Sequence, residues 1–351
     1  MSIHMAGIIG YGGMGRNHHC SIVHPNILYT AAYDVDPMRL AVAQKDGLVP
    51  CQTLEELLTM KDIELILVAT PNHVHLELVL AALAAGKHVI CEKPAALNSV
   101  DLARMYEAAE KAGKLFTIHQ NRRWDRDYQI ISQVVASGQL GKLFRIESRV
   151  QGARGIADTW RRYARFGGGM LYDWGVHLID QLLLLTNSSI TGVFAECQYL
   201  NQQEVDENVR LTLFFKNDMS ALVEIGTCNF QMLPRWYVCG KEGTTLIPYW
   251  DCQGETIVSS GEEIPWEDEI KTVSVMGPSR TLQPRGENTI RHLPLPVADG
   301  ICGFYEQMTH ALEGRNEVPV TRVQAERVMR VIDLAFVSAR KGQIINIEEG
   351  F

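Results

Sequence analysis

Apolar and polar positions alternate along the first 120 residues in a way that predicts a layered α/β domain. Short apolar runs at 7–9, 27–33, 65–69, 88–91 and 115–119 have the length and composition of buried strands. Stretches at 16–23, 74–85 and 102–112 read as helices. Strands that alternate with helices imply βαβ crossovers, so we predict a doubly wound parallel sheet of the Rossmann type with helices on both faces.

The pattern changes after residue 120. A helix is predicted over 128–137, followed by strands at 143–150, 192–200, 208–215, 220–229 and 236–240, in which polar and apolar residues interleave. Close-set strands of this kind indicate a large open, mostly antiparallel sheet. Helical periodicity returns at 303–312 and 323–340, and 344–347 closes the chain as a strand, whereas 254–296 gives no clear pattern. We predict two domains, a dinucleotide-binding domain over 1–122 and an α/β domain over 123–351.

A glycine-rich turn joins the first predicted strand to the first helix, with the sequence Gly10-Tyr11-Gly12-Gly13-Met14-Gly15. In such a turn the first glycine permits the tight bend, the second lets a diphosphate approach the main chain, and the third lets helix and strand pack closely. The N–H groups at the start of the helix then face the anion. A glycine hexad alone is also compatible with a surface turn.

Asp34 strengthens the dinucleotide interpretation. It lies nineteen residues after Gly15 at the end of the second predicted strand, where an acid can accept hydrogen bonds from the adenosine ribose. A carboxylate there repels a 2′-phosphate, which favours NAD over NADP. The alternative is that Asp34 caps the helix beginning near Pro37, but Asp36 is better placed for that role.

Composition excludes several classes of protein. The formal net charge of −8 disfavours a nucleic-acid or anionic-membrane binder, and no apolar run is long enough to span a membrane. The short N-terminal segment leaves no room for a signal peptide, and eight cysteines without C-x-x-C spacing fit a reducing cytoplasm. No nearby acid or cysteine completes a set of metal ligands with the pairs His18-His19 or His73/His75, so we expect no metal site.

Three residues are candidates for acid–base chemistry. Lys93 follows the strand at 88–91, where ligands bind to such sheets, although a solvated surface lysine is the common alternative. Asp173 and His177 follow a glycine loop on a largely apolar helix, and their spacing, continued by Asp180, puts all three on one face. Histidine is the natural base for an alcohol proton. Spacing alone leaves open that Asp173 caps the helix and that His177 is a satisfied core residue.

Two arginine-rich segments surround tryptophans, one with Arg122, Arg123 and Trp124 and the other around Trp160. They can line a pocket for a carboxylate, phosphate or polyol, with tryptophan against the apolar face of a sugar. A solvated, salt-bridged surface explains most of these arginines equally well. Arg122, Arg123 and Trp124 are the best candidates for substrate contact.

Through these motifs taken together, the chain resembles the family of glucose–fructose oxidoreductase, inositol 2-dehydrogenase and the MocA-type proteins. The resemblance runs along essentially the whole chain, through the glycine turn with Asp34, Thr70-Pro71-Asn72 with His75, Glu92-Lys93-Pro94, and Gly168 to Asp180. It implies a Rossmann domain, a C-terminal domain whose open sheet forms a homodimer or homotetramer, and hydride transfer between NAD(P) and a hydroxyl of a sugar or cyclitol. It also implies that Lys93, Asp173 and His177 form the catalytic group.

The resemblance places further contacts around that group. Beyond the glycine turn and Asp34, it assigns the cofactor to Thr70, Pro71, Asn72, His75, Glu92, Lys93 and Gln120. We expect the substrate to meet Lys93, Arg122, Arg123, Trp124, Trp160, Asp173 and His177. The expected partner is a small sugar or polyol, with no nucleic acid and no membrane. Two alternatives are a glycosidase that uses NAD for transient oxidation and a dinucleotide-sensing regulator without activity.

Overall fold

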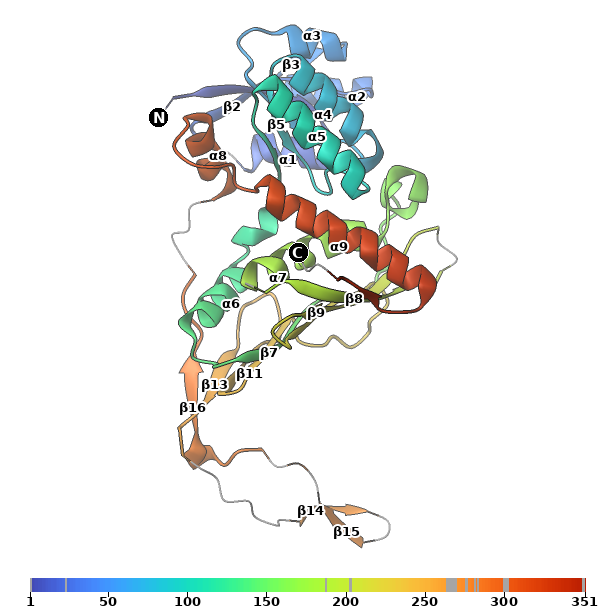
Figure 1. Cartoon of the computed structure of the whole chain (residues 1–351). Helices are drawn as coiled ribbons and strands as arrows, with labels where there is room; N and C mark the ends of the chain where they lie inside the picture. Colours follow the sequence, from blue (N-terminus) through green and yellow to red (C-terminus); the bar gives the residue numbers. More distant parts are fainter. Residues whose placement is uncertain are drawn as a thin grey trace.

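The fold is given by a computed structural model that describes residues 2–22, 24–186, 188–201, 204–262, 270–274, 277–280, 282, 284–298, 303–348 and 351. Figure 1 shows two bodies, an N-terminal one above and a C-terminal sheet below, with the long helix α9 (Arg322–Lys341) between them. Within the part that is described, no helix is long and apolar enough to cross a membrane.

The N-terminal body is a parallel sheet, as predicted, and has six strands in the order β3-β2-β1-β4-β5-β6. Its strands are β1 His4–Ile9, β2 Ile27–Tyr33, β3 Val49–Cys51, β4 Leu65–Val68, β5 His88–Cys91 and β6 Phe116–Ile118. Its helices are α1 Gly13–Cys20, α2 Pro37–Lys45, α3 Leu54–Thr59, α4 His75–Ala84 and α5 Ser99–Ala112, with a 3₁₀ turn at Asn72–Val74. The apolar runs that predicted β1 and β4 are fully buried over most of their length because helices cover both faces.

The C-terminal body is built on a nine-stranded mixed sheet in the order β16-β13-β12-β11-β7-β10-β9-β8-β17. Its strands are β7 Leu143–Gln151, β8 Ile190–Gln198, β9 Asn208–Phe215, β10 Ser220–Gly226, β11 Trp236–Gly240, β12 Gly243–Ile247, β13 Glu255–Ser259, β16 Ile290–Pro294 and β17 Ile345–Asn346. Strands β7 and β10 pair in parallel, and the other described pairs of this sheet are antiparallel. A separate hairpin joins β14 Ile270–Ser274 to β15 Gly277–Arg280.

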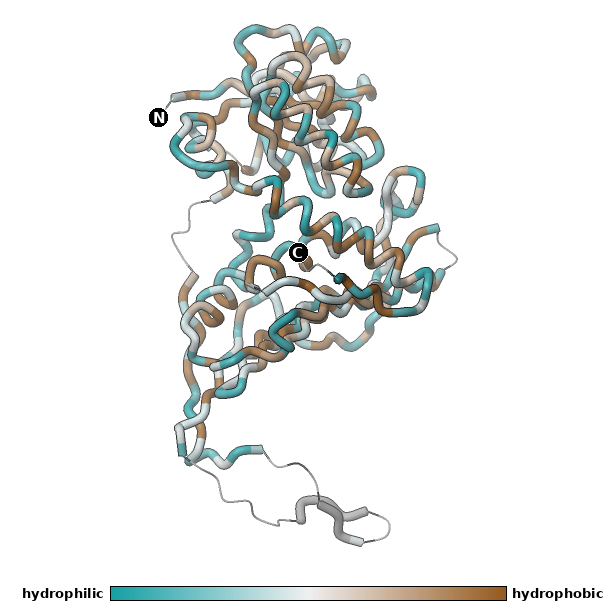
Figure 2. The backbone as a smooth tube through the Cα atoms, in the orientation of Figure 1, coloured by the Kyte–Doolittle hydropathy of each residue, from teal (hydrophilic) through white to brown (hydrophobic). Residues whose placement is uncertain are grey.

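Helices cover one face of the C-terminal sheet. They are α6 Arg126–Ser137, α7 Val176–Leu185 and α9, with 3₁₀ turns at Asn121–Trp124, Trp160–Arg162, Ala164–Phe166 and Glu287–Thr289 and a π-turn at Leu171–Gly175. Hydrophobic and hydrophilic positions alternate along α9 (Figure 2), and its apolar side packs on α5, α7 and β8. A capping box at Thr321 and Gln324 begins this helix and the left-handed Gly342 ends it.

One helix of the C-terminal half belongs to the N-terminal core. Helix α8 (Phe304–Leu312) buries Phe304, Tyr305 and Met308 against apolar residues of β1 and β2. The division of the chain at residue 122 therefore does not hold for α8, because this helix completes one face of the first sheet.

Candidate active site

The glycine turn has the geometry that close packing of β1 and α1 requires. Gly10 has a φ of +92°, and a Cβ on Gly15 would lie 2.0 Å from the main-chain oxygen of Gly10. Helix α1 begins at Gly13, and no side chain caps its N-terminus. Its first N–H groups are therefore available to an anion, as a diphosphate site needs.

Asp34 is held by the main chain beside this turn. Its Oδ2 accepts a hydrogen bond from the N–H of Tyr11 at 2.8 Å, and its Oδ1 accepts one from the N–H of Asp36 at 2.9 Å. Asp36 caps α2 by accepting from Met38 N–H at 2.9 Å, which confirms the prediction that Asp36 rather than Asp34 caps this helix. The carboxylate of Asp34 retains lone pairs for a ribose hydroxyl. Arg39, which sequence reasoning missed, approaches it to 3.7 Å.

A cavity of about 500 Å³ opens beyond the carboxyl ends of the first sheet. Predicted residues that line it are Gly12, Gly13, Met14, Thr70, Pro71, Asn72, Glu92, Lys93, Arg122, Trp160, Asp173 and His177. Ala69, Arg39 and Trp174 also line it and were not among the assigned site residues, and Asn121 and Arg161 line it from the segments around Trp124 and Trp160. The glycine turn and the candidate catalytic group therefore share one cavity.

Lys93 and Asp173 meet inside this cavity although 80 residues separate them. The Lys93 ammonium donates to Asp173 Oδ1 at 2.9 Å and to the Asp173 main-chain oxygen at 2.7 Å. Arg161 Nε donates to the same Oδ1 at 3.2 Å. Burial alone would raise the pKa of Asp173, but the charges of Lys93 and Arg161 hold it below its usual value. Asp173 is therefore ionised at neutral pH and orients the lysine.

His177 lies one turn further along the same helix and is only 4% exposed. Its Nδ1 is buried without a hydrogen-bond partner among the described residues, which leaves Nε2 as the nitrogen that can meet a substrate. Burial, together with the positive charges of Lys93 and Arg122, lowers the pKa of His177 well below 6.5. The imidazole is therefore neutral at physiological pH, the state that a general base requires.

Two separate stretches of the chain match family models. Residues 5–120 match the oxidoreductase family with an NAD-binding Rossmann fold, and residues 128–246 match the GFO/IDH/MocA C-terminal domain. An uncharacterised oxidoreductase of Schizosaccharomyces pombe is 39% identical over 315 residues, which are 84% of each chain. The chain belongs to the Gfo/Idh/MocA family of oxidoreductases.

Two further similarities cover nearly the full length. A crystal structure of an NAD-binding protein from Listeria innocua superposes with a TM-score of 0.89 and 35% identity, and covers 99% of this chain and 98% of that one. The scyllo-inositol 2-dehydrogenase (NADP⁺) IolW of Bacillus subtilis is 26% identical over 97% of this chain and 95% of its own. The predicted Gfo/Idh/MocA fold, oxidoreductase class and NAD-binding domain are thus confirmed.

Some of the residues that we assigned to the cofactor are buried next to the cavity and do not line it. His75 lies between the main-chain oxygens of Thr70 and Pro94, each 2.9 Å from one ring nitrogen, and donates to one of them in its neutral form, so it lies between the loops after β4 and β5. The Tyr11 hydroxyl bonds to His19 and Asp46. Tyr11, His75 and Gln120 are buried and are not among the residues that line the cavity, so direct contact with the cofactor stays a prediction for them.

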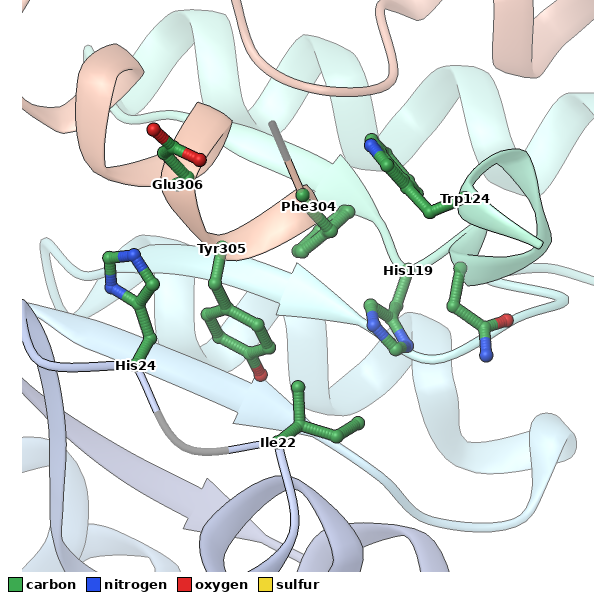
Figure 3. A pocket seen from close by; sticks show the side chains of 9 residues that line it. Ile22, His24, His119, Trp124, Phe304, Tyr305 and Glu306 are labelled. Atoms are coloured by element: carbon green, nitrogen blue, oxygen red, sulfur yellow. The ribbon is translucent and has the colours of Figure 1, made fainter. Parts of the chain in front are cut away.

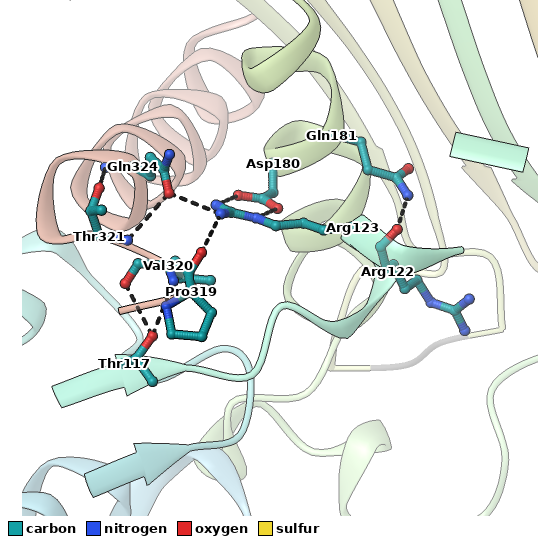
Figure 4. A network of polar contacts seen from close by, with 9 residues as sticks. All are labelled: Thr117, Arg122, Arg123, Asp180, Gln181, Pro319, Val320, Thr321 and Gln324. Atoms are coloured by element: carbon teal, nitrogen blue, oxygen red, sulfur yellow. Dashed lines mark hydrogen bonds and ion pairs between the residues drawn. The ribbon is translucent and has the colours of Figure 1, made fainter. Parts of the chain in front are cut away.

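The prediction of substrate contacts needs correction at Arg123 and Trp124. Arg123 is buried, pairs with both oxygens of Asp180 at 2.6 and 2.7 Å, and also bonds to Gln324 (Figure 4). The hydrogen bonds of this guanidinium join the 3₁₀ turn Asn121–Trp124 to α7 and α9. Asp180 is therefore paired with Arg123 and is not available to the catalytic group. Trp124 lines a second cavity of about 300 Å³ beside Phe304 and Tyr305 (Figure 3).

Glu92 is the centre of a buried polar cluster. Its Oε1 accepts from His18 Nε2 at 2.7 Å and from His119 Nδ1 at 2.8 Å, and His18 bonds in turn to the Tyr305 hydroxyl. His18, Glu92 and His119 are spaced closely enough to hold a metal ion, a grouping that sequence neighbourhood did not reveal. Both N···O separations are those of hydrogen bonds. Burial alone would raise the pKa of Glu92, but His119 and His18 hold it well below its usual range, so we interpret the cluster as a carboxylate bonded by two histidines.

Asp206, which sequence reasoning also missed, anchors the loop before Asp173. Its Oδ2 accepts from Leu171 N–H at 2.7 Å, and its main-chain oxygen accepts from Met170 N–H at 3.0 Å. A Cβ on Gly169 would lie 2.3 Å from Asp206 Oδ1, so only glycine fits beside this carboxyl. Asp206 thereby fixes the start of the π-turn Leu171–Gly175 that carries Asp173.

Asp206 should also make stability depend on pH. Burial raises the pKa of Asp206 from 3.8 to about 7. Because the unfolded chain releases this proton at a lower pH than the folded protein does, the contribution of Asp206 to the unfolding free energy is full below pH 4 and is lost as pH rises toward 7. Between pH 5 and 8 the wild type should lose about 2–3 kcal/mol more unfolding free energy than Asp206→Asn, which keeps an acceptor for Leu171. Urea unfolding at both pH values measures this, and identical pH dependence in the two proteins would contradict it.

Proposed function

We propose that this protein transfers a hydride between NAD and a secondary hydroxyl or ketone of a sugar, glycoside or cyclitol, with His177 as the acid–base residue. The observation that carries the proposal is the convergence of Lys93, Asp173 and a neutral, buried His177 in the cavity that the glycine turn also lines.

The donors of the chain fit NAD. The unsatisfied N–H groups of α1 suit a diphosphate, and Asp34 suits the 2′-hydroxyl of the adenosine ribose. When bound, NAD supplies the hydride acceptor. Arg39 offsets part of the Asp34 charge, but the carboxylate of Asp34 still repels a 2′-phosphate, so we propose NAD as the preferred cofactor and NADP as the poorer one.

The three polar residues divide the remaining work. In the oxidising direction, Nε2 of His177 takes the hydroxyl proton. Lys93, held by Asp173, donates a hydrogen bond to the hydroxyl oxygen and stabilises the negative charge that develops there. Burial of the cavity walls keeps the reacting carbon in one orientation, which supplies much of the rate.

We also propose that the uncovered face of the nine-stranded sheet forms a homodimer or homotetramer and that the protein works in the cytoplasm. Phe194, Phe214, Leu222 and Tyr237 are only partly buried on strands β8 to β11. The cysteines in the described part of the chain are all free thiols, which fits a reducing compartment.

A screen of the full chain tests the activity. NADH fluorescence is followed with sugars, sugar acids, glycosides and inositols, with NAD⁺ and NADP⁺ in parallel. Lasting NADH formation on a polyol is the expected result. Release of an aglycone without net NADH would instead identify a glycosidase, and tight NADH binding without turnover on any member would identify a regulator.

A further inference from the structure

We infer that the substrate carries an anionic group, a carboxylate or a phosphate, which Arg122 and Arg161 bind. This inference rests on the proposed function, because it concerns the substrate half of the same cavity. It is carried by the placement of these two guanidinium groups and by the charge balance of the cavity wall.

Arg122 is fixed in place before any ligand arrives. Its guanidinium lies 4.0 Å from the ring centre of Trp174 and 5.5 Å from that of Trp250, and its Nη1 donates to Asp125 at 2.7 Å. Gln181 holds its main-chain oxygen at 2.7 Å. The ion pair with Asp125 uses few of the five N–H donors of the Arg122 guanidinium. The remaining donors form a preorganised edge that is left to face the cavity.

Arg161 belongs to the arginine-rich segment around Trp160, and like Arg122 it is held by an aromatic ring and a carboxylate. It stacks on Trp160 at 4.6 Å and donates from Nε to Asp173 at 3.2 Å. About a third of its side chain is exposed, and it lines the cavity with Trp160. Each arginine is therefore backed by a tryptophan, and the tryptophans offer flat apolar surface to a sugar ring.

The charges of the cavity wall do not cancel. Its cations are Arg39, Lys93, Arg122 and Arg161, and its carboxylates are Glu92 and Asp173. Arg39 lies beside Gly12, where a Cβ would meet its Nη1 at 3.3 Å, so its charge belongs to the cofactor end. Asp173 is shared between Lys93 and Arg161, and Glu92 is bonded by two histidines. Asp125 pairs with Arg122 but does not line the cavity, so the surface that a substrate meets carries more cationic than acidic side chains and favours an anionic substrate.

The first arm of the test compares substrates on the wild type. The full chain with NAD⁺ is assayed on glucose, glucuronate and glucose 6-phosphate, and on the matched galactose set. The NADH-loaded protein is titrated with the same compounds by calorimetry. We expect the better acidic member to exceed its neutral parent at least about tenfold in kcat/KM or affinity, since charged hydrogen bonds are the strong ones.

The second arm uses variants. Arg122→Met and Arg161→Met should each lower the ratio of acidic to neutral kcat/KM by about 10- to 100-fold. Arg122→Lys should keep more of a preference for phosphate than for carboxylate, because lysine is a point charge without the bidentate fork. This separates the two anion sources. Arg104→Met, at an exposed position of α5, is the charge-matched control and should change neither ratio.

The outcomes separate this inference from the proposed function. Oxidation of neutral polyols without an acidic preference, or an equal loss on both substrates in the methionine variants, would overturn the anion site and leave the activity standing. Binding of acidic sugars that depends on Arg122 and Arg161, without NADH formation from any sugar, would support the anion site and overturn the activity. Thermal unfolding of every variant verifies that each is folded.

Discussion

Replacing His177 by alanine should lower kcat by about 10²- to 10⁴-fold, the usual contribution of a general base. The reason is that the buried, neutral imidazole is the described group of the cavity best suited to take a proton near neutral pH. Binding of NADH should be preserved, because the cofactor determinants lie on the first sheet. Steady-state turnover and NADH fluorescence titration measure the two effects separately.

A buried histidine outside the cavity provides the control. His4 pairs with Glu64 at the opposite end of β1, so His4→Ala should leave kcat unchanged. In the wild type, the acidic limb of kcat/KM should lie below pH 6.5, because the base stays unprotonated until the lowered pKa of His177 is reached. Turnover that survives in His177→Ala would remove this residue from the mechanism.

Adding one methyl group at Gly15 should disable the cofactor site. The new Cβ would lie 2.0 Å from the main-chain oxygen of Gly10, and main chain cannot move aside as a side chain can. We expect Gly15→Ala to lose about 3 kcal/mol of unfolding free energy, at the upper end of overpacking effects. Separation of α1 from β1 should also weaken NADH binding about tenfold or more, because a loss of about 1.4 kcal/mol of binding free energy lowers the affinity tenfold.

The neighbouring Gly13 supplies a matched control. A Cβ there would have nothing within 4 Å, so Gly13→Ala should change the unfolding free energy of the apoprotein by less than about 1 kcal/mol. NADH titration measures the affinity of Gly15→Ala. Urea unfolding of both variants decides the matter, because Gly13 itself lines the cavity and is a control for packing alone. Equal behaviour of the two substitutions would show that close packing at Gly15 is unimportant.

The sequence predicted the first sheet well because each of its longer strands is buried on both faces and bounded by glycine, proline or helix signals. The exception, β3, consists of three residues with a proline at its centre, too short to leave a periodic signal. In the C-terminal body the alternating strands were recognised, but their order and the parallel β7–β10 pair depend on contacts distant in sequence.

Lys93, Asp173 and His177 could be selected from sequence because strand ends and helical spacing mark them locally. For Arg161 the sequence left a salt-bridged surface as the alternative, and Asp206 was missed, because what identifies each is a partner far along the chain or across a loop. Arg122 and Arg123 show the limit most clearly. They are adjacent in one 3₁₀ turn, yet one faces the cavity and the other is buried against Asp180.

The position of α8 on the first sheet has a consequence for synthesis of the chain. Nascent residues 1–122 contain every strand of that sheet but leave the surface beneath Phe304, Tyr305 and Met308 uncovered. The dinucleotide-binding half therefore stays incomplete until α8 has left the ribosome, long after its own strands have been made. A fragment cut at residue 122 would expose apolar surface and would not be a faithful stand-in for the cofactor-binding half.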